Sequence, residues 1–205
     1  MFISVIIPTH NPNPGRFRRT IGAVRDQNFP SHQRELIVVD NGSAPRLDPK
    51  ILSSLADLPI TVVVEERLGL TPARIRGIRQ ARSEVIVFVD DDNVLATDYL
   101  SVASSRFEAD AKLGACGGKA LPEFETTPPD WTKEFWQMLA VRDLGPESLR
   151  ASGASSYPSC APIGAGMAVR RQLALKWAAE IEHDPIRMGL DRSGESLASG
   201  GDNDL

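Results

Sequence analysis

Short apolar runs recur through the first half of the chain, and segments with helical periodicity lie between them. The runs have the length of buried strands rather than of helices. Strands that alternate with helices are typical of a parallel sheet covered by helices. We therefore predict an α/β fold with a mostly parallel sheet flanked by helices. The expected strands are residues 2–8, 35–39, 60–64 and 85–89, and the expected helices between them are 16–28, 49–58 and 71–82.

The second half of the chain has a weaker pattern, and glycine- or proline-rich stretches separate its elements. Thr97 is an expected helix cap, because threonine favours the position before the first helical residue. Thr71, which precedes a proline, has the same signature. The remaining expected elements are a short strand within 113–120, a helix over 171–181 and a loop over 184–205.

The segment 121–162 is rich in proline and carries a stripe of Trp131, Phe135 and Leu139, with Trp136 beside it. Such a stripe at helical spacing is most often part of a hydrophobic core. The second interpretation is an exposed surface that shapes a binding site, because loops on a rigid scaffold often carry specificity.

Length, charge and hydropathy exclude several classes of protein. A chain of 205 residues, 41% of them hydrophobic, fits one compact domain. The net charge of −4 argues against a nucleic-acid partner, which needs clustered lysine and arginine. No apolar stretch has the length of a membrane span, and the start lacks the features of a signal peptide. We expect a cytoplasmic protein that can also associate peripherally with the cytoplasmic face of a membrane; the sequence does not indicate an oligomeric state.

Three aspartates, Asp90, Asp91 and Asp92, directly follow the apolar run 85–89. Adjacent carboxylates repel one another, and burial of their charge is costly. They are tolerated where a cation binds, and Mg²⁺ is usually held by one or two carboxylates together with substrate phosphates. The alternative is a polar loop that caps the following helix. We favour a site for a divalent metal and a diphosphate, because a cap does not require three acids.

Polar side chains also follow the first two expected strands. Thr9 and Asn11 follow the first strand, and Asp40 and Asn41 follow the second. Ligands of open α/β sheets bind beyond the carboxyl ends of the strands. The hydroxyl, amide and carboxylate groups at this edge suit a nucleobase, and the aspartate triplet suits ribose and metal. Ordinary turn chemistry is the competing explanation for residues 40–43.

The ordered set of motifs resembles family 2 glycosyltransferases with the GT-A fold, whose sheet is Rossmann-like. The resemblance lies in VIIPTHN (5–11), ELIVVDNGS (35–43), RLGLTPARIRGI (67–78) and FVDDDN (88–93). The stretch SGGDNDL (199–205) is similar to the family's Gly-Glu-Asp-x-Asp/Glu-Leu element, with Gly201 in place of the glutamate. Together these motifs cover nearly the whole chain in the family's order.

The resemblance implies an inverting transfer of a sugar from a nucleoside-diphosphate sugar to a hydroxyl of a saccharide or lipid-linked acceptor. It further implies assistance by Mn²⁺ or Mg²⁺ and a role in polysaccharide or glycoconjugate synthesis. Residues 1–100 would form a donor half and 101–205 an acceptor half of a single domain, which we expect to be truncated at its C-terminus. The resemblance assigns Asp92 to the metal, Asp202 to the catalytic base, Thr9, Asp40 and Arg67 to the nucleobase, Asp90 and Asp91 to ribose and phosphate, and Arg74 to the arginine of the family's Ala-Arg-Asn element.

Two other functions fit parts of the pattern. A sugar nucleotidyltransferase shares this type of sheet and its metal-binding carboxylates, but it needs a glycine-rich loop after the first strand, and residues 11–16 are poor in glycine. A non-catalytic domain that binds a nucleotide sugar or a carbohydrate is consistent with Gly201. Release of pyrophosphate from a nucleoside triphosphate would indicate the first function, and donor binding without turnover would indicate the second.

Overall fold

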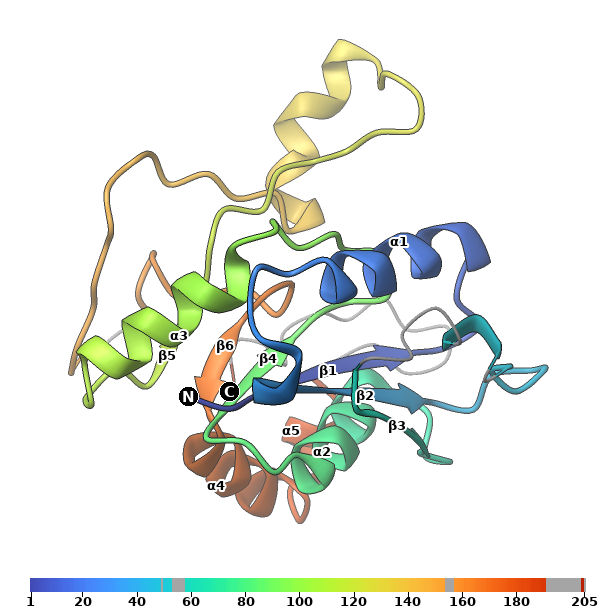
Figure 1. The fold of residues 1–205 in the computed structure, drawn as a ribbon. Helices are drawn as coiled ribbons and strands as arrows, with labels where there is room; N and C mark the ends of the chain where they lie inside the picture. Colours follow the sequence, from blue (N-terminus) through green and yellow to red (C-terminus); the bar gives the residue numbers. More distant parts are fainter. Residues whose placement is uncertain (49, 53–57, 154–156, 191–203, 205) are drawn as a thin grey trace.

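A six-stranded sheet forms the centre of the molecule, with the strand order β3-β2-β1-β4-β6-β5 (Figure 1). The computed structural model describes residues 1–48, 50–52, 58–153, 157–190 and 204, and only the backbone of 137–139. The predicted α/β class with a mostly parallel sheet is confirmed. The parallel strands are β1 (Ile3–Thr9), β2 (Arg34–Asp40), β3 (Ile60–Val64) and β4 (Val85–Phe88), and β6 (Ala168–Arg170) runs antiparallel to both β4 and β5 (Ala115–Cys116).

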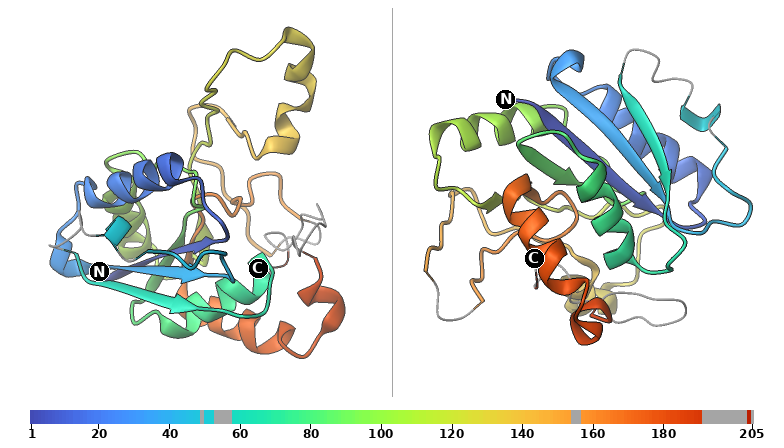
Figure 2. Two further views of the ribbon diagram at one scale, coloured as in Figure 1. Left: turned by 90° about the vertical axis from the view of Figure 1, so that its right-hand side faces the viewer. Right: turned by 90° about the horizontal axis from the view of Figure 1, so that it is seen from below.

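Alternating residues of the central strands face the two sides of the sheet, because successive side chains of a strand point in opposite directions. In β1, Val5 and Ile7 pack on one side together with residues of α1 and α3, and Ile6 packs on the other side with residues of α2 and α4. Helices therefore cover both faces (Figures 1 and 2), as strands that are apolar throughout predict. The helices are α1 (Pro14–Arg25), α2 (Leu70–Gln80), α3 (Tyr99–Ala109) and α4 (Arg171–Ile181).

Two expected helix caps are wrong. α2 begins after Gly69 rather than after Thr71, and α3 begins after Asp98 rather than after Thr97. The backbone N–H of Gly69 donates to Oδ1 of Asn41 at 2.8 Å. This bond joins the ends of different segments, so the start of α2 depends on a contact that no local pattern predicts.

Two helices begin with the same local signature, an asparagine or aspartate followed by proline. Oδ1 of Asn13 caps α1 by accepting hydrogen bonds from the backbone N–H groups of Gly15 at 2.9 Å and Arg16 at 3.1 Å. Asp184 caps α5 (Pro185–Met188) in the same way. Proline fits the first helical position because its missing N–H has no partner there. The loop expected over 184–205 is therefore wrong where α5 forms.

The other expected elements have mixed outcomes. The short strand expected within 113–120 is β5, and the helix expected over 171–181 is α4. Of the helix expected over 49–58, residues 50–52 form a 3₁₀ turn, and residues 49 and 53–57 lie outside the described residues. Within the described ranges, no helix combines the length and the apolar character that crossing a bilayer requires.

Residues 121–141 stand away from the sheet, and we call them the protruding segment (Figures 1 and 2). An antiparallel bridge between Ala120 and Arg142 closes its base. Two ion pairs tie its first residues to α1, Arg16 with Glu125 at 3.0 Å and Arg19 with Glu123 at 2.7 Å. The 3₁₀ helix η3 (Asp130–Leu139) lies within the segment.

Candidate functional site

The carboxyl ends of β1, β2 and β4 meet at one edge of the sheet, which we call the carboxyl rim. Thr9 is paired with Asp40, and Ile6 is paired with Phe88 in the neighbouring strand. Continuing the second register by three residues brings Thr9 level with Asp91. The Thr9 hydroxyl donates to Oδ2 of Asp91 at 2.5 Å. Parallel register thus brings predicted residues from three strands together.

Asp91 is the inner carboxylate of the aspartate triplet and is partly buried. Burial raises the pKa of Asp91, and the charge of Asp92 raises it further, while the hydrogen bond from Thr9 acts in the opposite direction. The hydroxyl of Thr20, on α1, donates to the backbone oxygen of Asp91 at 3.1 Å. The negative charge of Asp91 is therefore disfavoured in this place, and a nearby cation would favour it.

Asp92 is exposed, and across the described part of the chain its carboxylate accepts no hydrogen bond and forms no ion pair. The positive charge of Arg16 acts on it from α1. An open carboxylate oxygen is the ligand type that Mn²⁺ and Mg²⁺ take. The described residues hold no group of three histidine, cysteine or acidic side chains that would enclose a metal. Asp92 is therefore a candidate to supply one oxygen ligand to such a cation.

Asp90 lies at the start of the turn that carries the triplet. Its backbone oxygen accepts a hydrogen bond from the backbone N–H of Asn93 at 3.1 Å, and its side chain is half-buried. The turn separates three chemically identical neighbours into different environments. Contact of Asp90 with ribose or phosphate stays a prediction.

Asp40 is buried, with 2% of its surface exposed, and it orders the turn after β2. Its Oδ1 accepts from the backbone N–H of Ser43 and its Oδ2 from that of Leu47, both at 3.0 Å. Burial raises the pKa of Asp40, but the hydrogen bonds outweigh burial and hold the pKa below its usual value. Turn chemistry for residues 40–43 is therefore confirmed, and contact of Asp40 with a nucleobase stays a prediction.

Asn11 fastens the loop after β1 to the same turn. Its backbone N–H donates to Oγ of Ser43 at 2.9 Å, and its Oδ1 accepts from the backbone N–H of Ala44 at 2.8 Å. His10 is exposed, as expected of a loop residue, yet its Nδ1 donates to the backbone oxygen of Asn41 at 2.7 Å. These bonds join the ends of β1 and β2 into one surface.

Arg67 lies on the loop between β3 and α2, and half of its side chain is exposed. Its Nε donates to Oε1 of Glu65 at 3.1 Å, and this hydrogen bond raises the pKa of Arg67. Its Nη2 lies 4.0 Å from Oε1 of Glu182, which follows α4. The sequence did not single out Glu65. The available signal was an acidic residue at the carboxyl end of a strand: Glu65 directly follows β3, and Asp40 is the last residue of β2.

Arg74 is almost fully buried in α2, with 1% of its surface exposed. Its guanidinium carbon lies 5.6 Å from the centre of the Phe88 ring, at the end of β4. This position is beneath the carboxyl rim rather than on its surface. Direct contact of Arg74 with a donor stays a prediction.

The predicted base, Asp202, lies outside the described residues. Asp204, two positions later, is described, and its carboxylate is bound on both oxygens. Oδ2 accepts from Nε1 of Trp177 at 2.9 Å, and Nε of Arg187 donates to Oδ1 at 2.9 Å and to Oδ2 at 3.0 Å. Because both of its oxygens are occupied, Asp204 is a poor candidate for a proton acceptor.

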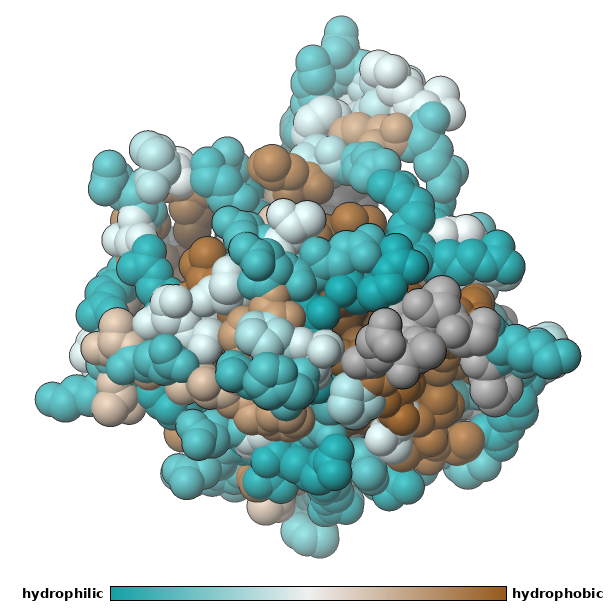
Figure 3. All heavy atoms as spheres, viewed as in Figure 1, coloured by the Kyte–Doolittle hydropathy of each residue, from teal (hydrophilic) through white to brown (hydrophobic). Residues whose placement is uncertain are grey.

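The aromatic stripe of the protruding segment is exposed. Trp131 is 68% and Phe135 47% exposed, and their rings meet edge to face with centres 6.2 Å apart. The core interpretation is wrong for these two residues, and the side chain of Leu139 lies outside the described residues. Trp136 instead packs on Phe124, with ring centres 4.8 Å apart. Figure 3 shows apolar atoms among hydrophilic ones on this segment.

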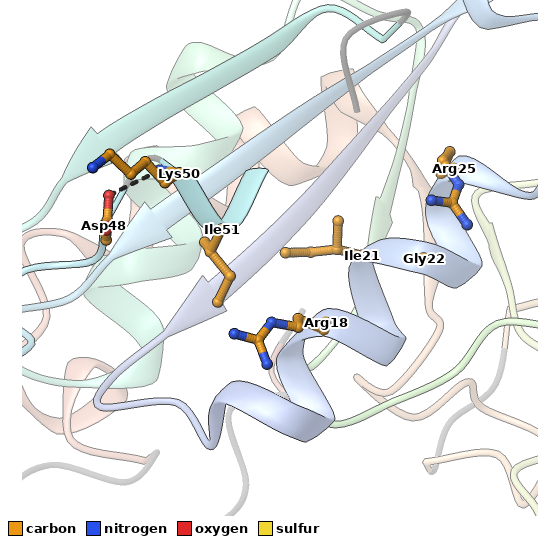
Figure 4. A pocket seen from close by; sticks show the side chains of 7 residues that line it. All are labelled: Arg18, Ile21, Gly22, Arg25, Asp48, Lys50 and Ile51. Atoms are coloured by element: carbon orange, nitrogen blue, oxygen red, sulfur yellow. Dashed lines mark hydrogen bonds between the residues drawn. The ribbon is translucent and has the colours of Figure 1, made fainter. Parts of the chain in front are cut away.

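A pocket of about 530 Å³ lies between α1 and the residues that follow the turn after β2 (Figure 4). No predicted donor or metal residue lines it. The carboxyl rim, rather than this pocket, therefore remains the candidate functional site. The lining residues are Arg18, Ile21, Gly22, Arg25, Asp48, Lys50 and Ile51.

Known proteins and solved structures are similar to this chain. An N-acetylglucosaminyltransferase of Bradyrhizobium elkanii is 31% identical over 123 residues, which are 58% of this chain and 66% of that protein. The mannosyltransferase PcManGT from Pyrobaculum calidifontis, solved with GDP-Man and Mn²⁺, has a TM-score of 0.60 at 23% identity, over 85% of this chain and 46% of that one. S. aureus TarS 1-349 with UDP-GlcNAc has a TM-score of 0.51 at 23% identity, over 65% and 38% of the two chains.

These matches show the fold and the family of this chain. The structural neighbours share the fold, and the chain spans less than two thirds of the length of the relatives that it matches. The model of the family described as "Glycosyl transferase family 2" matches residues 4–174, well over half of the sequence. The chain belongs to glycosyl transferase family 2.

Proposed function

We propose that this protein transfers a sugar, with inversion, from a nucleoside-diphosphate sugar to an acceptor hydroxyl in polysaccharide or glycoconjugate synthesis. The observation that carries the proposal is the carboxyl rim, where the open carboxylate of Asp92 lies next to the Thr9–Asp91 hydrogen bond. Ligands of open α/β sheets bind at this edge. Family membership and neighbours solved with UDP-GlcNAc or GDP-Man support a donor of this class.

Different residues of the carboxyl rim bind different parts of the donor in this proposal. Thr9, Asp40 and Arg67 recognise the nucleobase, with Asp40 acting in part through the turn that it orders. Asp90 and Asp91 lie near ribose and phosphate, and Asp92 would hold Mn²⁺ or Mg²⁺. The bound cation supplies positive charge to the diphosphate of the leaving group.

Asp202 is the proposed general base. It takes the proton of the acceptor hydroxyl while that oxygen attacks the anomeric carbon from the face opposite the leaving diphosphate. The bond to the diphosphate oxygen breaks as the new glycosidic bond forms, so the anomeric centre inverts. One base and no enzymic nucleophile are sufficient, as in the inverting hydrolysis of glycosides. The commitment of both Asp204 oxygens to Trp177 and Arg187 supports the choice of Asp202.

The second half of the chain is the proposed acceptor side. The exposed rings of Trp131 and Phe135 suit the apolar faces of a saccharide, either free or lipid-linked. The division at about residue 100, the cytoplasmic location and a peripheral contact with a membrane are part of the same proposal. A nucleic-acid partner is not part of it.

A thermal-shift panel tests donor and metal together. The full chain is heated with UDP, GDP or dTDP, each with and without Mn²⁺, because a ligand that binds the native state raises its apparent stability. We expect one nucleotide to raise Tm only when Mn²⁺ is present. No shift with any nucleotide would contradict the donor site. Release of pyrophosphate from a nucleoside triphosphate would indicate a nucleotidyltransferase instead.

Asp202→Asn tests the chemistry. General-base catalysis contributes about 10²–10⁴-fold, so we expect kcat to fall by about that factor while the nucleotide-dependent Tm shift persists. Normal transfer by this variant would contradict the assignment of the base. Donor binding by wild-type protein without turnover would indicate the non-catalytic alternative.

A further inference from the structure

Asn41 is buried at the carboxyl rim, with 5% of its surface exposed. Its backbone joins the two central strands, because its N–H donates to the oxygen of Thr9 at 2.8 Å and its oxygen accepts from Nδ1 of His10 at 2.7 Å. These two bonds hold the backbone of Asn41 in place without a ligand, and so they fix the position from which its side chain extends.

The side-chain amide of Asn41 turns toward the loop between β3 and α2. Its Nδ2 donates to the backbone oxygens of Glu65 at 3.0 Å and Arg67 at 2.7 Å, and its Oδ1 accepts from the backbone N–H of Gly69 at 2.8 Å. An asparagine amide has two N–H donors, so both are already used within the protein. Asn41 is therefore poorly suited to donate to a nucleobase, the role that the sequence suggested.

A second contact holds the same loop against the same turn. Gly42 has a positive φ of 69°, and a Cβ built on it would lie 2.8 Å from Cδ2 of Leu68. The positive φ favours glycine at this position, and the Leu68 side chain fills the space beside it. The turn after β2 thus holds residues 65–69 in place, by the hydrogen bonds of Asn41 and by the packing of Gly42 against Leu68.

Arg67 lies between Glu65 and Gly69, whose backbone groups both bind the side chain of Asn41. Asn41 holds its backbone oxygen, and Glu65 holds its guanidinium through Nε at 3.1 Å. Groups held in the binding geometry before a ligand arrives lose less entropy on binding. Asn41 also contacts the start of α2, because the backbone N–H of Gly69, the residue before the first helical one, donates to its Oδ1.

We propose that Asn41 is a positioning residue that presents Arg67 to the nucleotide, and that it does not itself bind the donor. This inference rests on the proposed function, in which Arg67 contacts the nucleobase. It predicts that Asn41 matters for donor affinity only as long as Arg67 is present. A purely structural asparagine would affect stability without this dependence.

The test is a double-mutant cycle on donor KM, with UDP-GlcNAc and GDP-mannose as probes and Asn41→Ala and Arg67→Ala as the changes. Misplacement of a binding group commonly weakens function about tenfold or more. We expect Asn41→Ala to raise donor KM about tenfold in the parent chain and less than about twofold in the Arg67→Ala background. An unchanged KM in the first case, or an equal rise in both backgrounds, would overturn the inference.

Two further variants keep the test informative. Asn41→Asp preserves size and the acceptor for Gly69, but it places a carboxylate oxygen against the backbone oxygens of Glu65 and Arg67; we expect a folded protein with raised donor KM, and normal KM would overturn the inference. Asn13→Ala is the matched control, because Oδ1 of Asn13 also holds a helix start without touching the 65–69 loop. It should lower Tm and leave donor KM unchanged.

These outcomes are separable from failure of the proposed function. If wild-type protein neither binds nor turns over any nucleotide sugar, the proposed function fails first. If it transfers sugar normally and Asn41→Ala leaves donor KM unchanged, only the positioning role fails.

Discussion

The two edges of the sheet treat acidic residues in opposite ways. At the amino edge, Glu35 is buried and accepts hydrogen bonds from Ser4 Oγ at 2.6 Å and from Arg82 N, Nε and Nη2 at 2.9, 3.0 and 2.7 Å. At the carboxyl rim, Asp92 has no such partner in any described residue. The first carboxylate is satisfied within the protein, and the second is available to the ligand that we propose for this rim.

The pKa directions follow the same division. Burial raises the pKa of Glu35, but the bonds from Ser4 and Arg82 outweigh it and hold the pKa below its usual value. Burial and the neighbouring charge of Asp92 raise the pKa of Asp91. A satisfied carboxylate stabilises the fold, whereas a crowded one is tolerated where it serves binding.

Among the variants that test this comparison of the two edges, Asp92→Asn should have the largest effect, a loss of kcat. The charge that faces the proposed cation is lost, and loss of one group that stabilises developing charge commonly lowers kcat about 10²-fold. Steady-state transfer assays over a range of Mn²⁺ concentrations measure this effect. Tm without ligand should not fall, because Asn keeps the size of Asp and removes a like charge beside Asp91. Asp98→Asn, an exposed control without a side-chain cap bond, should transfer normally, and equal activity of all three proteins would contradict the prediction.

Glu35→Gln should lower stability instead of activity. The amide NH₂ of glutamine would face the donors of Arg82, and a buried hydrogen-bonding group left without a partner costs about 2 kcal/mol. Urea unfolding measures the change. Glu66→Gln is the control, because its ion pair with Arg46 at 2.7 Å is exposed and exposed pairs contribute little. A Glu35→Gln protein as stable as wild type would show that the amino edge does not depend on this carboxylate.

The same residue gives a pH dependence with a definite sign. Glu35 has a lower pKa in the folded state than in the unfolded chain, so its ionisation stabilises the fold above the unfolded pKa of about 4.3. That contribution is lost as pH falls through the folded pKa. We expect the stability difference between wild type and Glu35→Gln to shrink below pH of about 4. Urea unfolding over a series of pH values measures it, and a constant difference would contradict the sign.

Trp131→Ala should have the smallest effect, and it compares two tryptophans of the protruding segment. Trp131 is exposed, whereas Trp136 packs on Phe124 and donates through Nε1 to Thr132 Oγ1 at 3.1 Å. An aromatic contact contributes about 1 kcal/mol, so we expect acceptor KM to rise about fivefold in Trp131→Ala with Tm unchanged. Trp136→Ala should lower the stability of the segment. Unchanged acceptor KM for both variants would exclude the segment from the acceptor site.

The sequence predicted the features that depend on local pattern. Strands and helices of the α/β sheet were predicted because their residues are apolar at the right period, and α4 begins and ends where expected. The caps of α1 and α5 were also readable, because Asn13 and Asp184 each precede a proline. A short polar residue before a proline is therefore a local signal of where these two helices begin.

Features that depend on contacts between distant segments could not be predicted. Adjacent aspartates have the same chemistry in the sequence, and only the turn after β4 makes Asp91 partly buried and Asp92 exposed. Asn41 looked like a ligand residue because nothing local reveals that its amide reaches the loop of Glu65 and Arg67. The composition of the rim was thus predictable, and the division between binding and support was not.

The position of β6 has a consequence for how this chain can be divided. β6 comes late in the sequence, yet it pairs with β4, and β5 joins the sheet by pairing with β6. A fragment ending near residue 100 would therefore leave the apolar strand β4 as a bare edge, a common cause of aggregation. Co-expression of the two halves as a split protein should yield soluble material only when they reassociate across this strand pair.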